Sequence, residues 1–168
     1  LARYFKSRNM QVSGYDKTPT TLTNALNEEG IPVHFTDGVQ HIPQEFRQIE
    51  KTLVVYTPAI PAQNEALNYF MQNGFDVYKR ARILAEIANQ GKSIAVGGTH
   101  GKTTTSSLIA HIFNQQKNVA SAFLGGIAKN FKTNFVAGKS DLVVLEADEF
   151  DRSFHFLSPD IAVITSMD

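Results

Sequence analysis

The chain has 168 residues, of which 42% are hydrophobic and 19% charged, as in an ordinary globular protein with one domain or two small ones. Sixteen basic and sixteen acidic residues give a net charge of zero, so we expect no strong binding to nucleic acids or anionic membranes. The absence of cysteine excludes disulfides and thiolate metal sites, and no apolar run approaches the roughly 18 residues of a membrane span. A cytoplasmic location fits this composition.

The first residues predict a helix followed by a strand. Leu1, Tyr4 and Phe5 have helical spacing, and residues 11–15 predict a short strand that ends just before Asp16. In dinucleotide-type folds an acidic residue at this place can bind a ribose, provided that a glycine-rich turn precedes the first helix. The alternative is that Asp16 only caps a loop, and the sequence leaves both interpretations open.

Strand and helix signals then alternate as far as residue 90. Thr18 predicts a helix N-cap, with Pro19 at the first helical position, and Gly30 predicts the end of that helix. Further strands are predicted at residues 32–35, 53–56 and 75–78, and further helices at residues 65–73 and 82–90. This order predicts an α/β fold with a parallel sheet.

Thr57 directly follows the apolar strand predicted at residues 53–56. Ligands in open α/β sheets bind at the carboxyl ends of strands, so Thr57 is a candidate phosphate or sugar contact. A connection stiffened by the prolines that follow is the alternative.

The strongest functional signal is a glycine-rich turn between a strand predicted at residues 93–96 and a helix predicted at residues 102–115. On that helix Leu108, Ile109 and Ile112 share one face, which we expect to be buried. Strand, glycine-rich turn and helix N-terminus together predict a phosphate-binding loop. The nucleotide-binding residues predicted here are Gly98, Thr99, His100, Gly101, Lys102, Thr103 and Thr104.

In such a loop the main-chain N–H groups point inward, and the helix end adds a partial positive charge. We expect the amides between Val96 and Lys102 to bind the polyphosphate of ATP, with the Lys102 side chain on the outer phosphates. The Thr103 hydroxyl would ligate Mg²⁺. The usual pattern G-x-x-x-x-G-K-[ST] is not met in full, because Val96 stands where its first glycine would be.

A carboxylate predicted beside the loop would complete the metal site. Residues 142–145 predict a buried strand that ends on Glu146, and an acidic residue there is the usual Mg²⁺ partner of the loop threonine. Glu146 is therefore predicted as a metal ligand with Thr103 and as a catalytic residue with Lys102. Asp148, Glu149 and Asp151 follow at once, and a solvated acidic turn is an alternative for the last two.

The remaining apolar segments predict two more strands. Residues 119–124 predict one, followed by a tight turn at Gly125 and Gly126, and residues 160–165 predict a buried strand at the end of the chain.

Two segments resemble those of the Mur ligases, which build the peptide of the bacterial cell-wall precursor: GTHGKTTT at residues 98–105 and LEADEFDRSF at residues 145–154. The resemblance implies a Rossmann-like, UDP-sugar-binding domain at residues 1–88, whose first strand and glycine-rich turn are missing. It also implies the first part of a P-loop ATPase α/β domain at residues 89–168. In the family a C-terminal domain follows, so we expect this fragment to be inactive by itself.

The acidic segment is most similar to that of the member that joins L-alanine to UDP-N-acetylmuramate through an acyl phosphate. ATP and Mg²⁺ are the implied cofactors, small molecules the implied partners, and association into oligomers is left open. Asp16 and Thr57 become candidate contacts to the UDP-sugar. A family alternative adds a tripeptide in murein recycling, but its acidic motif continues differently after Asp151. Outside the family, the alternatives are a P-loop switch or motor ATPase and a non-catalytic nucleotide-sugar-binding module.

Overall fold

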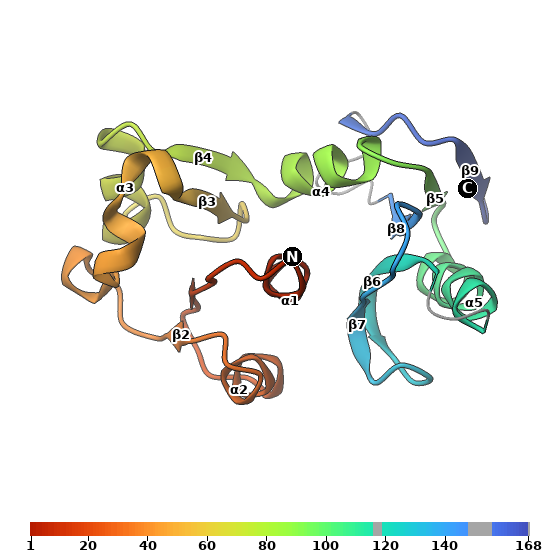
Figure 1. Cartoon of the computed structure of the whole chain (residues 1–168), viewed down its shortest axis with the longest axis horizontal. Coiled ribbons are helices and arrows are strands. Elements are labelled where there is room, and N and C mark those ends of the chain that lie inside the picture. The colour runs from red at the N-terminus through yellow and green to blue at the C-terminus, as the bar shows by residue number, and fades with distance from the viewer. Residues whose placement is uncertain (116–118, 148–155, 168) are drawn as a thin grey trace. The chain divides into compact units, whose positions relative to one another are not determined.

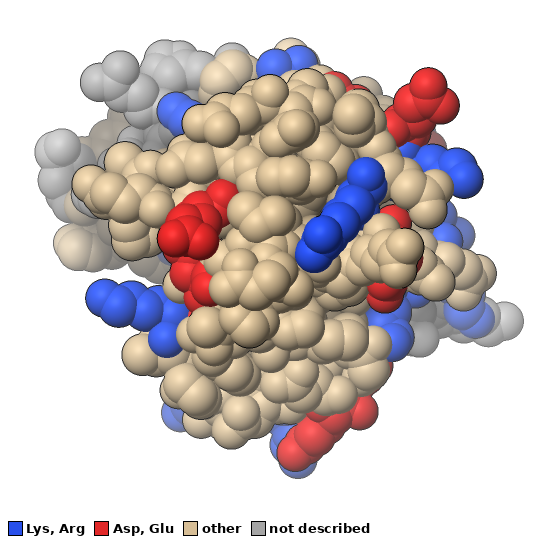
Figure 2. All heavy atoms as spheres, turned by 90° about the vertical axis from the view of Figure 1, so that its left-hand side faces the viewer, with Lys and Arg blue, Asp and Glu red and all other residues tan. Residues whose placement is uncertain are grey.

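The computed structural model describes residues 1–115, 119–147 and 156–167, and the chain divides into two compact units, Leu1–Arg80 and Ala81–Asp168 (Figure 1). Both units combine helices with parallel strands, which confirms the predicted α/β fold class. Within the described residues, none of the helices is both long and apolar enough to cross a membrane. The face drawn in Figure 2 shows acidic and basic side chains interspersed among uncharged ones.

The first unit begins with helix α1 (Ala2–Ser7) and contains two separate pairs of parallel strands. Strand β1 (Gly14–Tyr15) pairs with β2 (Val33–His34), and β3 (Leu53–Tyr56) pairs with β4 (Asp76–Lys79). Helix α2 (Thr21–Glu28) joins the first pair and α3 (Glu65–Gln72) the second, with short helices η1 (Val39–His41), η2 (Gln44–Arg47) and η3 (Ile49–Lys51) before β3. The predicted strand-helix-strand order is therefore present in both pairs.

Helix α2 begins two residues later than predicted. Its N-cap is Thr20, whose hydroxyl accepts a hydrogen bond from the Thr23 N–H, while the Thr23 hydroxyl accepts one from the Thr20 N–H. This reciprocal capping box satisfies two N–H groups that have no partner inside the helix. Thr18 and Pro19 consequently lie before the helix, whereas Gly30 follows its end with φ of 75°, as expected for a glycine there.

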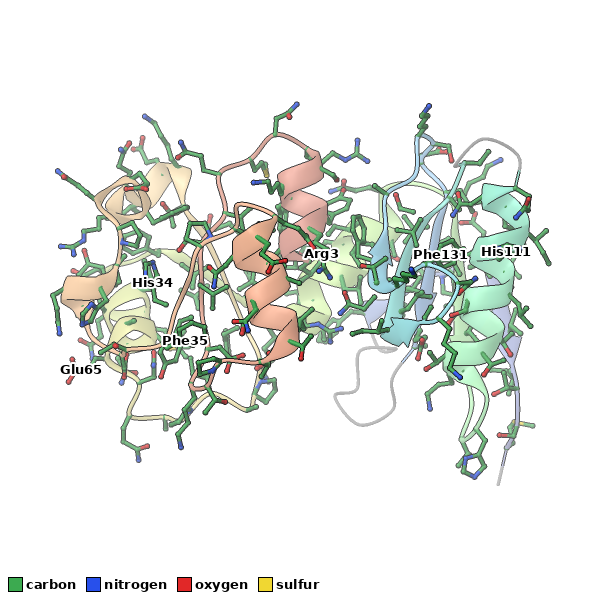
Figure 3. All side chains as sticks on the ribbon, turned by 90° about the horizontal axis from the view of Figure 1, so that it is seen from below. Arg3, His34, Phe35, Glu65, His111 and Phe131 are labelled. Atoms are coloured by element: carbon green, nitrogen blue, oxygen red, sulfur yellow. The ribbon has the colours of Figure 1, made fainter. Side chains whose placement is uncertain are left out.

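The loop after β2 is fastened to the start of α3 by the carboxylate of Asp37. Its Oδ2 accepts the N–H of Glu65 (2.9 Å), and its Oδ1 accepts those of Ala66 (3.2 Å) and Gly38 (2.8 Å); Glu65 is labelled in Figure 3. Burial by itself raises the pKa of Asp37, but the three N–H donors favour the charged form more strongly, and the pKa lies below its usual value.

Because the pKa of Asp37 is lowered in the folded state, its stabilising effect is complete above the pKa of the unfolded carboxyl, about 3.9, and is lost as the pH falls through the folded value. Asn at this position has one acceptor oxygen and turns an N–H₂ group toward other N–H donors. We expect Asp37→Asn to lower the free energy of unfolding by about 1 kcal/mol at pH 7 and by less near pH 3. Urea unfolding at both pH values measures the difference. The control is Glu50→Gln, which changes an exposed side chain of η3. A difference that does not shrink on acidification would contradict this role.

The second unit contains a five-stranded sheet in the order β7-β6-β8-β5-β9. Its elements are α4 (Arg80–Asn89, which begins on the last residue of the first unit), β5 (Ser93–Gly97), α5 (Lys102–Asn114), β6 (Ser121–Ala128), β7 (Thr133–Val136), β8 (Val143–Glu146) and β9 (Ile161–Ile164). Strand β5 lies between β8 and β9 and is parallel to both. The carboxyl ends of these three strands therefore meet at one edge of the sheet, which is where α/β proteins bind ligands.

Two strand predictions for this unit are wrong in detail, and a further strand, β7, was not predicted. Strand β7 is antiparallel to β6, because residues 129–132 form a short turn and a parallel partner would need a long crossover. Strand β6 runs through Gly125 and Gly126, so the glycine pair is not a turn. Strand β9 is at the sheet edge rather than buried, with Ile161 54% and Ile164 58% exposed.

The buried face of α5 differs in part from the prediction, because Ile109 packs partly buried against the core but its two predicted neighbours on that face do not. Leu108 and Ile112 are 57% and 66% exposed, whereas Ser106 and Ala110, four residues apart, are fully buried. Small side chains on this face let α5 pack closely on the sheet, where Ala110 joins a core with buried residues Ile94, Ala120, Ala122, Leu124, Ala128 and Val144. The rotation that buries Ser106 also places the start of α5 beside the end of β8.

Candidate active site

The turn between β5 and α5 depends on two glycines with positive φ. Gly98 has φ of 124° and Gly101, the N-cap of α5, has φ of 80°. Residues with a Cβ rarely adopt such angles. A Cβ at Gly98 would also collide with Thr165 and Ser166, which follow β9. The turn is therefore shaped by the segment that crosses it as well as by its own sequence.

Thr165 and Ser166 bind the main chain of this turn. The Thr165 hydroxyl lies within hydrogen-bond distance of the carbonyls of Gly97 (3.1 Å) and His100, and its one hydrogen can be donated to either of them. Ser166 accepts the His100 N–H on its Oγ (3.0 Å) and the Thr99 N–H on its carbonyl oxygen (3.4 Å). Two of the amides expected to bind the polyphosphate, those of Thr99 and His100, therefore donate within the chain in this structure.

The other anion-binding groups lie in the first turn of α5. The N–H groups of Lys102, Thr103 and Thr104 stand at the helix start, where they have no acceptor inside the helix. Together with the positive end of the helix dipole they suit an anion. The Lys102 ammonium lies over the turn and donates to the Gly98 carbonyl (2.6 Å). When a nucleotide binds, a phosphate oxygen would replace this carbonyl as the acceptor of the Lys102 ammonium.

Glu146 lies at the end of β8, beside Val96 of β5, and its carboxylate faces the first turn of α5. Oε2 accepts a hydrogen bond from the Thr103 hydroxyl (3.0 Å). Oε1 accepts one from the Ser106 hydroxyl (3.0 Å) and one from the Gly125 N–H (2.6 Å). The structure therefore brings together Thr103 and Glu146, which are 43 residues apart in the chain.

A hydroxyl and a carboxylate side by side are suitable ligands for Mg²⁺. This ion prefers oxygen ligands and is usually bound through one or two carboxylates together with substrate phosphates and water. In residues 1–115, 119–147 and 156–167 there is no group of three or more His, Asp or Glu side chains that could hold a metal by itself. A site completed by the phosphates of a nucleotide agrees with both observations. Asp148, Glu149, Asp151 and His155 lie outside the described residues.

Four groups at this site were not predicted from the sequence: the Ser106 hydroxyl, the Gly125 N–H, Thr165 and Ser166. Only Ser106 had a usable signal, because it follows Thr103 by three residues and therefore shares its helix face. The other three reach the site through sheet pairing, which local sequence does not reveal.

The two candidate substrate residues belong to the first unit, and both are exposed. The Asp16 carboxylate accepts the Thr18 N–H (3.2 Å), the contact expected of a loop cap. Thr57 begins a turn in which its carbonyl accepts the Ile60 N–H (3.1 Å). Their substrate roles stay predictions.

His111 lies on α5, away from the phosphate-binding end of the helix. It hydrogen-bonds Gln115 (3.0 Å) and packs against the ring of Phe131, with ring centroids 6.2 Å apart (Figure 3). These contacts are typical of a side chain with a structural role.

The family model "Mur ligase family, catalytic domain" matches residues 1–92, and the model "Mur ligase middle domain" matches residues 96–168. The chain belongs to the Mur ligase family. This Mur ligase chain is 52% identical to the UDP-N-acetylmuramate–L-alanine ligase of Parabacteroides distasonis and 53% identical to that of Porphyromonas gingivalis. Each match includes the whole chain and 37% of the relative, so the chain spans a little over a third of these proteins.

Solved structures of Mur ligases have the same fold. The UDP-N-acetylmuramate–alanine ligase of Thermotoga maritima matches 98% of this chain with a TM-score of 0.86 and 27% identity, over 38% of its own length. The UDP-N-acetylmuramate:L-alanyl-γ-D-glutamyl-meso-diaminopimelate ligase of Neisseria meningitides matches 99% with a TM-score of 0.81, over 56% of its length. At 22% identity, the second likeness concerns the fold alone.

Proposed function

We propose that this Mur ligase chain belongs to an ATP-dependent ligase that joins L-alanine to UDP-N-acetylmuramate in peptidoglycan precursor synthesis. The observation that supports this choice most strongly is the identity of 52% over the whole chain to a relative named for that reaction. The tripeptide-adding alternative has only a likeness of fold in its support, at 22% identity. ATP, Mg²⁺ and a cytoplasmic location are part of the proposal.

Each of the two parts of the chain would bind a different substrate. We assign the UDP-sugar to residues 1–88, with Asp16 and Thr57 as candidate contacts, and the nucleotide to residues 89–168. Gly98, Gly101 and the first turn of α5 would bind the polyphosphate. Thr99 and His100 could offer their N–H groups only after the bonds to Ser166 break.

The reaction needs activation of a carboxylate, because its oxygen is a poor leaving group. In the proposed reaction a substrate carboxylate oxygen attacks the γ-phosphorus of ATP, the bond to the β–γ bridging oxygen breaks, and ADP leaves. The amine nitrogen of L-alanine then attacks the acyl carbon of the resulting acyl phosphate. The tetrahedral intermediate loses phosphate, and the amine gives its proton to water.

The residues near the turn suit the first of these steps. Negative charge is spread over the transferred group, so fixed positive groups at that point lower the barrier. Lys102 and the N–H groups of the first turn of α5 would supply them. Thr103 and Glu146 would hold Mg²⁺, which when bound neutralises charge on the β- and γ-phosphates.

Phosphate release by the full-length protein tests the proposal. With ATP, Mg²⁺ and UDP-N-acetylmuramate present, we expect release to depend on L-alanine and to stay at background with a cell-wall tripeptide. Omission of UDP-N-acetylmuramate is the control. Release with the tripeptide alone would favour the recycling reaction, and release without any amine would favour a simple ATPase.

A further inference from the structure

Glu146 has two carboxylate oxygens with different surroundings. Oε2 meets only the Thr103 hydroxyl among the hydrogen bonds of the described residues, whereas Oε1 accepts from both Ser106 and Gly125. Hydrogen bonds to a charged acceptor are about twice as strong as those between neutral groups. Two of them on the same oxygen oppose rotation of the carboxylate about its Cγ–Cδ bond.

Both donors to Oε1 are themselves held in place. Ser106 is fully buried on the sheet-facing side of α5. The Gly125 N–H belongs to β6, which pairs with β8 up to Phe123 and Leu145. A Cβ on Gly125 would lie 2.5 Å from Oε2 and 3.1 Å from Cδ of Glu146, so only glycine lets the strand approach the carboxylate this closely.

We propose that Ser106 and the Gly125 N–H are positioning groups that occupy Oε1 of Glu146 and leave Oε2, beside Thr103, as the single oxygen for Mg²⁺. This rests on the proposed function, because it assumes that Thr103 and Glu146 bind the metal of an ATP complex. Mg²⁺ requires nearly ideal octahedral geometry with short ligand distances, so a carboxylate that rotates freely is a poorer ligand.

A purely local role for Ser106 is the alternative. Its hydroxyl also lies 3.1 Å from the Thr103 carbonyl, and serines in helices often bond the carbonyl one turn back. The hydroxyl has one hydrogen, however, and the charged Oε1 at 3.0 Å is the stronger acceptor of the two. A local role would leave metal binding unchanged, so the two interpretations predict different results.

The test is calorimetric binding of a non-hydrolysable ATP analogue to the full-length protein, over a range of Mg²⁺ concentrations and in EDTA. For Ser106→Ala we expect the Mg²⁺ concentration that gives half of the metal-dependent gain in affinity to rise about tenfold, as for other groups that orient metal ligands. Affinity in EDTA should stay at the wild-type value. Ser107→Ala is the matched control, because the hydrogen bonds to Glu146 among the described residues come from Thr103, Ser106 and Gly125 and not from this neighbouring serine.

The Gly125→Ala substitution disturbs the same carboxylate from β6, because its Cβ would collide with Oε2 of Glu146, and it keeps Ser106. It therefore tests the proposal even if the Ser106→Ala protein does not fold. We expect the same shift in Mg²⁺ dependence. Wild-type Mg²⁺ dependence in a folded Ser106→Ala or Gly125→Ala protein would overturn the proposal, and so would an equal loss of affinity with and without metal. If the wild-type protein binds the analogue with the same affinity in Mg²⁺ and in EDTA, the proposed metal site is overturned, and this inference with it.

Discussion

Lys102→Ala is expected to weaken ATP binding on the order of 100-fold, since a charged hydrogen bond contributes up to about 3 kcal/mol. The Lys102 ammonium lies over the turn, where it now donates to the Gly98 carbonyl, and no other side chain among the predicted nucleotide-binding residues is a fixed cation. Calorimetry on the full-length protein with ATP and Mg²⁺ measures the loss.

Removal of Lys102 should leave the fold intact, because the side chain is only partly buried and its hydrogen bond among the described residues is to the turn itself. The matched control is Lys129→Ala, which removes an exposed lysine of the same unit. Thermal unfolding of both variants should resemble that of the wild type. Unchanged ATP affinity in Lys102→Ala would count heavily against a nucleotide site at this turn.

Glu146→Gln should lower the rate of phosphate release on the order of 100- to 1,000-fold, as expected when an electrostatic group that stabilises the transition state is lost. The amide oxygen can still accept from Ser106 and Gly125, so the packing around position 146 is kept. The amide N–H₂ then faces the Thr103 hydroxyl, where the carboxylate would have ligated Mg²⁺.

Binding measurements separate this effect from a general loss of affinity. In EDTA the Glu146→Gln protein should bind ATP at least as well as the wild type, because a negative charge near the phosphates is gone. Addition of Mg²⁺ should raise the affinity of this variant for ATP only slightly. The control is Glu86→Gln on α4, which breaks an exposed ion pair with Arg82. A Glu146→Gln protein with wild-type turnover would exclude the residue from the metal site.

Local sequence patterns were sufficient for most of the elements that build the site. The apolar run before Gly97 and the residues after Gly101 predicted β5 and α5 to within one residue at each end. The start of α2 was missed because Thr20 competes with Thr18 as N-cap, and the reciprocal bond to Thr23 decides between them. Such a choice depends on side-chain geometry that a pattern does not contain.

A turn was wrongly predicted at Gly125 because glycine is frequent in turns. In the structure this glycine is part of a strand, and its missing side chain makes room for the carboxylate of Glu146. The burial of α5 was misjudged for a related reason. Ser106 and Ala110 of this helix are fully buried and Ile109 and Phe113 pack partly buried against the core, whereas Leu108 and Ile112 stay exposed.

By itself, the sequence determined the α/β class, the strand-turn-helix unit at residues 93–114 and the family, since these depend on periodicity, glycines and motifs that are local in the chain. Only the tertiary structure decided which groups surround Glu146 and which amides of the turn are already bonded. Ser106, Gly125 and Ser166 come from a helix face, a neighbouring strand and the segment after β9. Strand order and helix rotation bring them together, and both are set by packing across the whole sheet.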